Sequence, residues 1–320
     1  MKKIICLPGA LLVSLLMGAL PAAEFPATEI TNGLVHARIY LPDAENGYYR
    51  GTRFDWSGVI PELSFNKHSY SGQWFDNYTP TKNDAVMGPV EAFDPLGYDE
   101  AGAGGSFVKI GIGVLSKPDA TPYSPFKYYQ ILNAGHWEIK RSAADIRFIH
   151  RLDDKAYAYI YEKEVKLVKG KPELLLIHSL KNTGKKTIET EVFDHNFFLL
   201  DHRPMGPGLV LKFPFHPSAE QARGLDDIAA LRADSITVLR QPAPRESVYA
   251  ELLGFGKSER DYDIRLQNHI TGTGVRIRCD RPLSRLVFWG SSTILCPEPY
   301  IRVKVLPGET FHWTIRYDFN

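Results

Sequence analysis

The chain has 320 residues, and its 38 basic and 37 acidic side chains leave a formal net charge of +1 at neutral pH. So balanced a charge gives no field to attract nucleic acid or an anionic membrane, and it favours a neutral partner. Three cysteines exclude a scaffold held by several disulfides, while 26 glycines, 22 prolines and 12% aromatic residues favour many strands and turns.

The first 23 residues have the pattern of a secretory signal peptide. Lys2 and Lys3 precede the apolar residues 4–20, and the small residues Ala22 and Ala23 follow. This order of basic, apolar and small residues is typical of a cleaved leader, and the apolar run is short for a membrane span. We therefore expect a signal peptide over residues 1–23 and one domain over residues 24–320, working in the periplasm or outside the cell without membrane insertion.

The next segments alternate polar and apolar residues, as a half-buried strand does. Residues 34–41 and 48–56 read as two strands joined by a turn at Asn46-Gly47. The second strand carries Arg50 and Arg53. Either is a candidate ligand contact, and the alternative is an exposed cation at a sheet edge.

Two loops then mix flat rings with hydrogen-bonding groups, which is the chemistry of sugar recognition. The loop of residues 65–76 contains His68 and Trp74, and the loop of residues 87–98 contains Glu91. The rings would pack on the apolar face of a sugar while the polar groups bind its hydroxyls. For Glu91 a solvated loop carboxylate is an equal alternative.

Strand patterns recur along the rest of the chain, and only residues 217–234 look helical, with Ser218 as a cap. Recurrent strands bounded by turns predict an all-β fold, a large antiparallel β-sandwich with one short helical insertion. The predicted strands are residues 107–115, 135–142, 145–151, 156–167, 173–180, 248–254, 263–268, 274–279, 284–289, 301–306 and 310–319.

The segment of residues 191–208 concentrates the chemistry. It is an aromatic, strand-like run that carries Asp194, His195, Asp201 and His202 and ends in a Pro-Gly turn. A histidine held rigidly on a strand suits general acid or base catalysis near neutral pH. The alternatives are a hydrogen-bonded core histidine and a cation site formed by Asp194, Asp201 and His202, although no metal motif is present.

Two motifs resemble the aldose 1-epimerase, or galactose mutarotase, family. One is Asn182-Thr183-Gly184 followed by Asp194-His195-Asn196-Phe197-Phe198, and the other is Glu298 followed by Pro307-Gly308-Glu309. The resemblance implies a mutarotase-like sandwich in which His195 is the general acid, Glu298 is the general base and no cofactor is needed. It also implies an arginine near the sugar, a part that Arg50 or Arg53 could play.

The chain departs from the family at one point. The family has Leu-His-Gly-Gly where this sequence has Val86-Met87-Gly88-Pro89. Either His68 supplies the missing imidazole with Glu91 as a new contact, or the sugar or the reaction differs. The predicted ligand is a sugar or oligosaccharide, and its expected contacts are Arg50, Arg53, His68, Trp74, Glu91, Asp194 and His202.

Three functions remain open from the sequence alone. The first is an aldose 1-epimerase-like enzyme, the second a non-catalytic periplasmic carbohydrate-binding protein, and the third a polysaccharide lyase that uses tyrosine and histidine near a uronate. Cys279 and Cys296 are expected either to pair or to serve as small buried hydrophobes.

Overall fold

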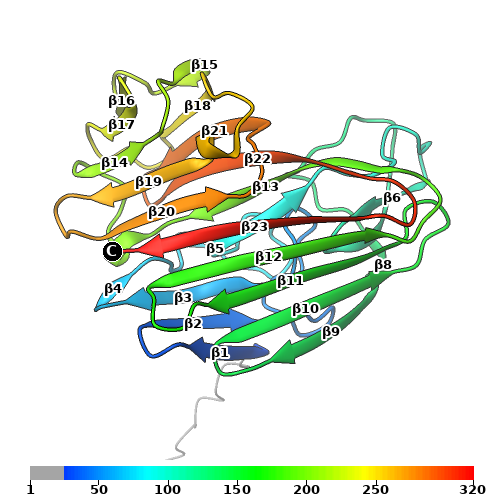
Figure 1. The fold of residues 1–320 in the computed structure, drawn as a ribbon. Coiled ribbons are helices and arrows are strands. Elements are labelled where there is room, and N and C mark those ends of the chain that lie inside the picture. The colour runs from blue at the N-terminus through cyan, green and yellow to red at the C-terminus, as the bar shows by residue number, and fades with distance from the viewer. Residues whose placement is uncertain (1–24) are drawn as a thin grey trace, which may run out of the picture.

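The computed structural model describes residues 25–320, so the predicted signal peptide lies outside the described residues. Every strand pairing in this range is antiparallel, and the strands form two packed layers (Figure 1). The predicted all-β antiparallel sandwich is confirmed. No helix of the described residues is long and apolar enough to cross a membrane.

The first layer is a ten-stranded sheet, seen in front in Figure 1. Its strands in spatial order are β16 (Ala229–Arg232), β17 (Ser235–Val238), β14 (Leu209–Lys212), β19 (Asp263–Asn268), β20 (Gly274–Cys279), β23 (Thr310–Phe319), β12 (Glu173–Asn182), β11 (Tyr159–Leu167), β10 (Asp145–Leu152) and β9 (His136–Arg141).

The second layer combines a six-stranded and a four-stranded sheet, which approach each other where the Ile60 N–H donates to the Met87 carbonyl at 3.3 Å. The six-stranded sheet has the order β15 (Ser218–Arg223), β18 (Ser247–Leu253), β21 (Arg285–Ser291), β22 (Leu295–Val305), β13 (Ile188–Phe197) and β5 (Gly88–Phe93). The other has the order β1 (Ala27–Thr31), β2 (Val35–Tyr40), β3 (Val59–Phe65) and β4 (His68–Ser69).

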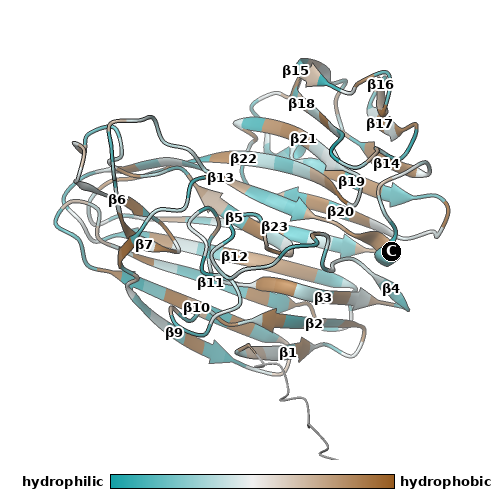
Figure 2. Ribbon diagram, turned by 180° about the vertical axis from the view of Figure 1, so that it is seen from behind, coloured by the Kyte–Doolittle hydropathy of each residue, from teal (hydrophilic) through white to brown (hydrophobic). Residues whose placement is uncertain are grey.

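Three short strands and two single 3₁₀ turns complete the described elements. They are β6 (Ser106–Lys109), β7 (Gly113–Ser116), β8 (Ile131–Asn133), η1 (Leu200–His202) and η2 (Glu259–Asp261). Seen from behind, long loop segments pass in front of the second layer (Figure 2). The second layer is therefore covered on its outer side by loops.

Strand alternation divides the buried side chains into two clusters. Successive side chains on a strand point to opposite faces, so the central strands β3, β5, β13 and β22 of the second layer contribute to both. On β13, for example, Val192 joins the main core between the layers, while Phe197 joins a second apolar cluster under the covering loops. The second cluster forms the floor and walls of the site described below.

Two sequence expectations fail here. Residues 217–234 contain β15 and β16 rather than a helix, because β15 pairs with β18 and β16 pairs with β17. Residues 48–56 form no strand, because β2 pairs with β1 and β3 instead. Residues 48–56 form a loop instead, and the rings of this loop are part of the second cluster. Cys279 and Cys296 are both free and buried, so they form no disulfide.

Candidate active site

His195 and Glu298 meet on the outer face of the second layer. His195 lies on β13 and Glu298 on the neighbouring β22, and their side chains are 3% and 8% exposed. His195 Nε2 is 3.3 Å from Glu298 Oε1. Two proton-transfer groups with this separation can share one proton and present it to a bound molecule.

The imidazole of His195 is held by stacking rather than by a hydrogen bond. It lies parallel to Phe197 with ring centroids 3.8 Å apart, and Phe197 stacks in turn on Trp74 at 5.2 Å. Phe54 meets the imidazole edge-on at 5.6 Å. Within residues 25–320, His195 Nδ1 has no hydrogen-bond partner. The stack fixes the ring plane, so that Nε2 faces Glu298.

Burial controls the protonation of this pair. Loss of water raises the pKa of Glu298 to about 7, against the opposing charges of Arg53 and Arg285. Burial, aided by the charge of Arg53, lowers the pKa of His195 well below its usual 6.5. Just below pH 7 the pair therefore holds one dissociable proton, which is placed on Glu298 when the cavity is empty.

The pair opens into a cavity of about 380 Å³, which is at the small end of the size range of ligand sites. Rings supply much of its surface: Trp74, Phe126, Phe197, Tyr249, Trp289 and Tyr300. Flat apolar rings beside a few polar groups match the two-sided chemistry of a sugar, which has both C–H faces and hydroxyls.

Three arginines also line this cavity. Arg53 pairs with Asp84 and lies between the rings of Phe54 and Phe126, with its guanidinium carbon 4.7 and 4.9 Å from their centroids. Arg285 pairs with Glu251 at 3.0 Å. Arg223 lies on edge strand β15. Partners thus neutralise the first two arginines and hold them in place.

Two prolines shape the backbone between His195 and Glu298. Regular pairing of β13 with β22 stops at Phe193, opposite Tyr300. Pro297 and Pro299 follow on β22, and proline has no N–H to donate to a ladder.

The side chain of Asn196 replaces the missing ladder bonds. Its Nδ2 donates to the carbonyls of Pro297 and Asp194, both at 3.1 Å. This amide thereby ties β13 to β22 directly beneath the pair, and it sets how far apart His195 and Glu298 lie.

Several expected contact residues point away from this cavity. Asp194 precedes His195 on β13 and, by alternation, faces the core, where Tyr317 donates to it. Glu91 on β5 is opposite Asp194 in the pairing register and therefore faces the core as well. There it is fully buried and bonded to Lys163 and to His178 Nε2. The expectation that Glu91 and Asp194 bind the ligand is corrected by this register.

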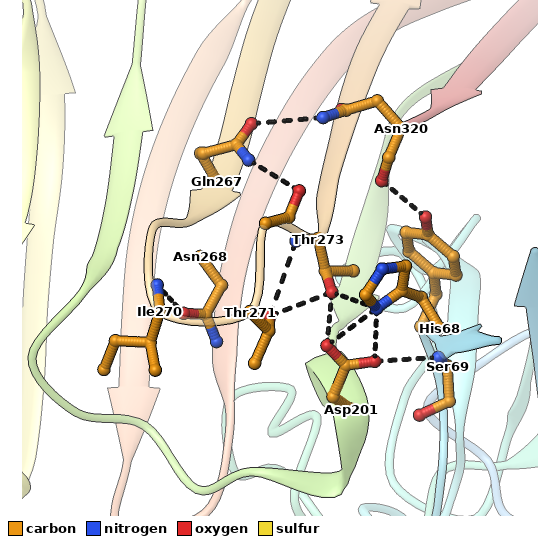
Figure 3. A network of polar contacts seen from close by, with 11 residues as sticks. His68, Ser69, Asp201, Gln267, Asn268, Ile270, Thr271, Thr273 and Asn320 are labelled. Atoms are coloured by element: carbon orange, nitrogen blue, oxygen red, sulfur yellow. Dashed lines mark hydrogen bonds and ion pairs between the residues drawn. The ribbon is translucent and has the colours of Figure 1, made fainter. Parts of the chain in front are cut away.

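His68 belongs to a different network, shown in Figure 3. Its Nδ1 lies 3.1 Å from the carboxylate of Asp201 and 2.8 Å from the Thr273 hydroxyl, which itself donates to Asp201. The Ser69 N–H donates to the same carboxylate at 3.1 Å. His68 thus anchors the η1 turn and does not supply the missing family imidazole.

The other residues expected to contact the ligand fall into two groups. Arg53 and Trp74 line the cavity, whereas Arg50 and His202 do not. His202 lines a second cavity next to it. Residues 87–98 were expected to be a loop whose rings contact the sugar, but β5 within them is a buried strand. No group of three histidine, cysteine or acidic side chains that could hold a metal occurs within residues 25–320.

Some lining residues were missed from the sequence. Tyr300 and Phe197 lie two positions from Glu298 and His195, so alternation would have found both. Arg285 and Trp289 lie on β21, which neighbours β22, and Tyr249 lies on β18, one strand further out in the sheet order. No local signal in the sequence gives that order.

Comparison with known proteins identifies the fold. No family model matches the chain, and no curated protein matches it in sequence. Several solved structures, however, match it in fold. A galactose mutarotase-related enzyme from Lactobacillus acidophilus is 13% identical, with a TM-score of 0.57 over 92% of this chain and 97% of its own. An aldose epimerase homologue from C. elegans is 12% identical, with a TM-score of 0.58 over 92% and 98%.

A galactose mutarotase-like protein from Clostridium acetobutylicum is 11% identical and has a TM-score of 0.58 over 91% of this chain and 94% of its own. All three likenesses extend over nearly the whole of both chains. The chain therefore has the galactose mutarotase-like fold, as its motifs predicted. Identities this low show the fold alone.

Proposed function

We propose that the protein interconverts the anomers of a sugar by acid–base ring opening. The observation that carries the proposal is the buried contact of His195 Nε2 with Glu298 Oε1, at 3.3 Å, in the aromatic cavity. One group takes the proton of the anomeric hydroxyl and the other protonates the ring oxygen, so the C1–O5 bond breaks and an open-chain aldehyde forms. Rotation about C1–C2 and the reverse transfers give the other anomer.

The proton count of the pair supports this chemistry. An anomeric interchange moves one proton from oxygen to oxygen and consumes none, so the site needs one acid and one base at the start. Neutral Glu298 with neutral His195 satisfies that need, and so does the ionised form with the proton on His195. A sugar hydroxyl beside Glu298 would favour the second form, because it stabilises the carboxylate by a hydrogen bond.

The test is a panel of anomerically pure sugars, followed by polarimetry or by NMR of the anomeric proton. We expect the parent to accelerate at least one interchange, and Glu298→Gln and His195→Asn to lose about 10²- to 10⁴-fold in rate. Glutamine keeps the shape of Glu298, and asparagine keeps a polar group in place of His195, so binding should persist. Equal rates in parent and variants would refute the catalytic assignment.

A non-catalytic sugar-binding protein is the second candidate. One observation favours it: Val86 and Met87, where the family has its second histidine, are buried in the apolar cluster. Such a protein would bind a sugar in the same cavity without accelerating anomer interchange. Calorimetric binding with no rate acceleration on the same panel would identify it.

The place of action is part of the proposal. The basic, apolar and small residues at positions 1–23 support export through a cleaved leader. The intact mass of protein recovered from a bacterial host's periplasm tests this. A mass that still includes residues 1–23 would contradict it.

A further inference from the structure

We propose that a second cavity, next to the His195–Glu298 cavity, is a subsite for a neighbouring sugar unit, and that the ligand is the reducing end of an oligosaccharide. The inference rests on the proposed function, since it assumes that the first cavity holds a sugar. The second cavity has a volume of about 530 Å³, larger than the 380 Å³ of the first. One further sugar ring fits a space of this size.

The two cavities share a wall. Trp74 lines both of them. Ser291 lines the first and Thr293 the second, and their hydroxyl oxygens are 3.2 Å apart. The two cavities therefore adjoin at Trp74 and this hydroxyl pair, and we expect a ligand of two sugar units to extend past them from the first cavity into the second.

The second cavity has the chemistry of a sugar subsite. Gln73, Asp76, His202 and Thr293 provide neutral and acidic hydrogen-bonding groups, and Trp74 provides a ring. Among the residues that the structure describes, no lysine or arginine lines it, in contrast to the three arginines of the first cavity. Hydroxyls, which both donate and accept hydrogen bonds, suit these groups better than an anion does.

The side of the second cavity that His202 lines is held in a fixed conformation. His202 and its neighbour Asp201 have left-handed backbones, with φ near 54° and 53°, a conformation that non-glycine residues adopt only when the surroundings hold it. The network of Figure 3 does so, because Asp201 accepts from the Ser69 N–H and the Thr273 hydroxyl and pairs with His68. The role of His68 in this protein is therefore to position the His202 turn.

Gly72 lets the segment that precedes Gln73 lie close to the turn that carries His202. A Cβ at Gly72 would lie 3.2 Å from the Leu199 side chain and 3.3 Å from His202 Nδ1, closer than most Cβ contacts. Glycine thus allows the segment that carries Gln73 and Trp74 to pack against the turn.

The stacked rings connect the subsite to the catalytic pair. Trp74 stacks on Phe197, and Phe197 stacks on His195. A sugar against Trp74 would stabilise the stack that orients the imidazole. Occupation of the second cavity is therefore expected to improve both affinity and the placement of His195.

The test measures equilibrium binding by titration calorimetry, so that its result does not depend on catalysis. The probes are glucose, maltose, cellobiose and lactose, which share a glucose reducing end. We expect at least one disaccharide to bind about tenfold more tightly than glucose, which corresponds to one hydrogen bond of about 1.4 kcal/mol. His202→Ala and Asp76→Ala should each lower this preference severalfold.

The matched control is His216→Ala, an exposed histidine that lines neither cavity, which should leave the preference unchanged. Circular dichroism checks that each variant is folded. Equal binding of glucose and all three disaccharides would overturn the subsite, as would a preference that His202→Ala and Asp76→Ala leave intact. Tight disaccharide binding without anomer interchange would refute only the proposed catalysis.

Discussion

Two buried acid–base clusters lie on opposite sides of the six-stranded sheet, and they differ in one respect. Toward the core, Glu91 is bonded to Lys163 and His178, so its charge is compensated by the protein itself. Toward the loops, His195 is the only ion-pair partner within 4 Å of Glu298 among residues 25–320; Arg53 and Arg285 act on it from farther away, and the pair faces a cavity. Burial alone does not mark a functional group. A buried pair that leaves room for a further partner does.

The pKa directions of the two glutamates express the same difference. Burial raises the pKa of each, but the charges of Lys163 and His178 outweigh burial at Glu91 and lower its pKa to about 2. At Glu298 burial prevails and the pKa rises to about 7. Glu91 is thus permanently ionised at neutral pH, whereas Glu298 titrates there.

The largest expected effect tests the core cluster. Glu91→Gln leaves the Lys163 ammonium buried without its counter-charge, and breaking a buried ion pair in this way costs about 3–5 kcal/mol. We expect that loss in the free energy of unfolding by denaturant. Glu298→Gln should cost little stability, because the carboxyl it replaces already tends to be neutral. If Glu298→Gln destabilised the fold as much as Glu91→Gln, the contrast between the clusters would be lost.

A second prediction concerns Asn196, whose side chain joins β13 to β22 beneath the His195–Glu298 pair. Asn196→Ala frees the Pro297 carbonyl and lets β13 and β22 separate, so kcat should fall about ten- to hundredfold with a smaller change in KM, as expected for misplaced catalytic groups.

Asn182→Ala is the matched control. The Asn182 amide also bridges two carbonyls, those of Lys186 and Val305, but outside the site. It should lose similar stability and keep its kcat. Equal kcat losses in the two variants would show that Asn196 is merely structural.

The difference between the Glu91 cluster and the His195–Glu298 pair could be predicted only in part from the sequence. The alternation on β13 was readable, and it alone places Asp194 and His195 on opposite faces. That Glu91 faces the core depends on its register with Asp194, which no local pattern specifies. The pair of His195 with Glu298 was expected from family motifs, because their separation along the chain gives no physical reason for contact.

The failed helix at residues 217–234 has a physical cause. Its alanines and Leu231 form a weak helical stripe, but Gly224 has a φ of 74° and the β15–β18 pairing shifts register between Glu220 and Arg223. Pairing with strands distant in sequence thus overrides a weak local preference. The same irregular strand brings Arg223 to the cavity, which the helical interpretation concealed.

A third prediction is the pH dependence of the rate. The pKa of Glu298 is raised to about 7, so the pair holds its single proton below that pH and loses it as the pH rises through 7. The logarithm of kcat/KM should fall with a slope approaching one per pH unit above about 7. A rate that stays level from pH 6 to 9 would show that this proton is not used.

The smallest effect is expected at Asp194, whose environment resembles that of Glu298 although it faces the core. Burial, with the nearby charge of Glu91, raises the pKa of Asp194 to about 8. The Tyr317 hydroxyl donates to Asp194 and lies 3.0 Å from Asn196 Oδ1. Asp194→Asn keeps an oxygen that can accept from Tyr317, so below about pH 4, where the parent carboxyl is protonated in the folded and the unfolded chain, it should change the free energy of unfolding by no more than about 1 kcal/mol.

The pH dependence of that variant gives the sharper measurement. A carboxyl with a raised pKa contributes stability that is present below the unfolded value of 3.8 and is lost as the pH rises through about 8. Asparagine does not titrate, so the stability of Asp194→Asn relative to the parent should rise between about pH 4 and 8. A relative stability that falls over this range would mean that Asp194 is ionised in the core. If the relative stability rises as expected, the two faces of β13 differ in their partners, but on both faces a buried carboxyl without a counter-charge keeps its proton.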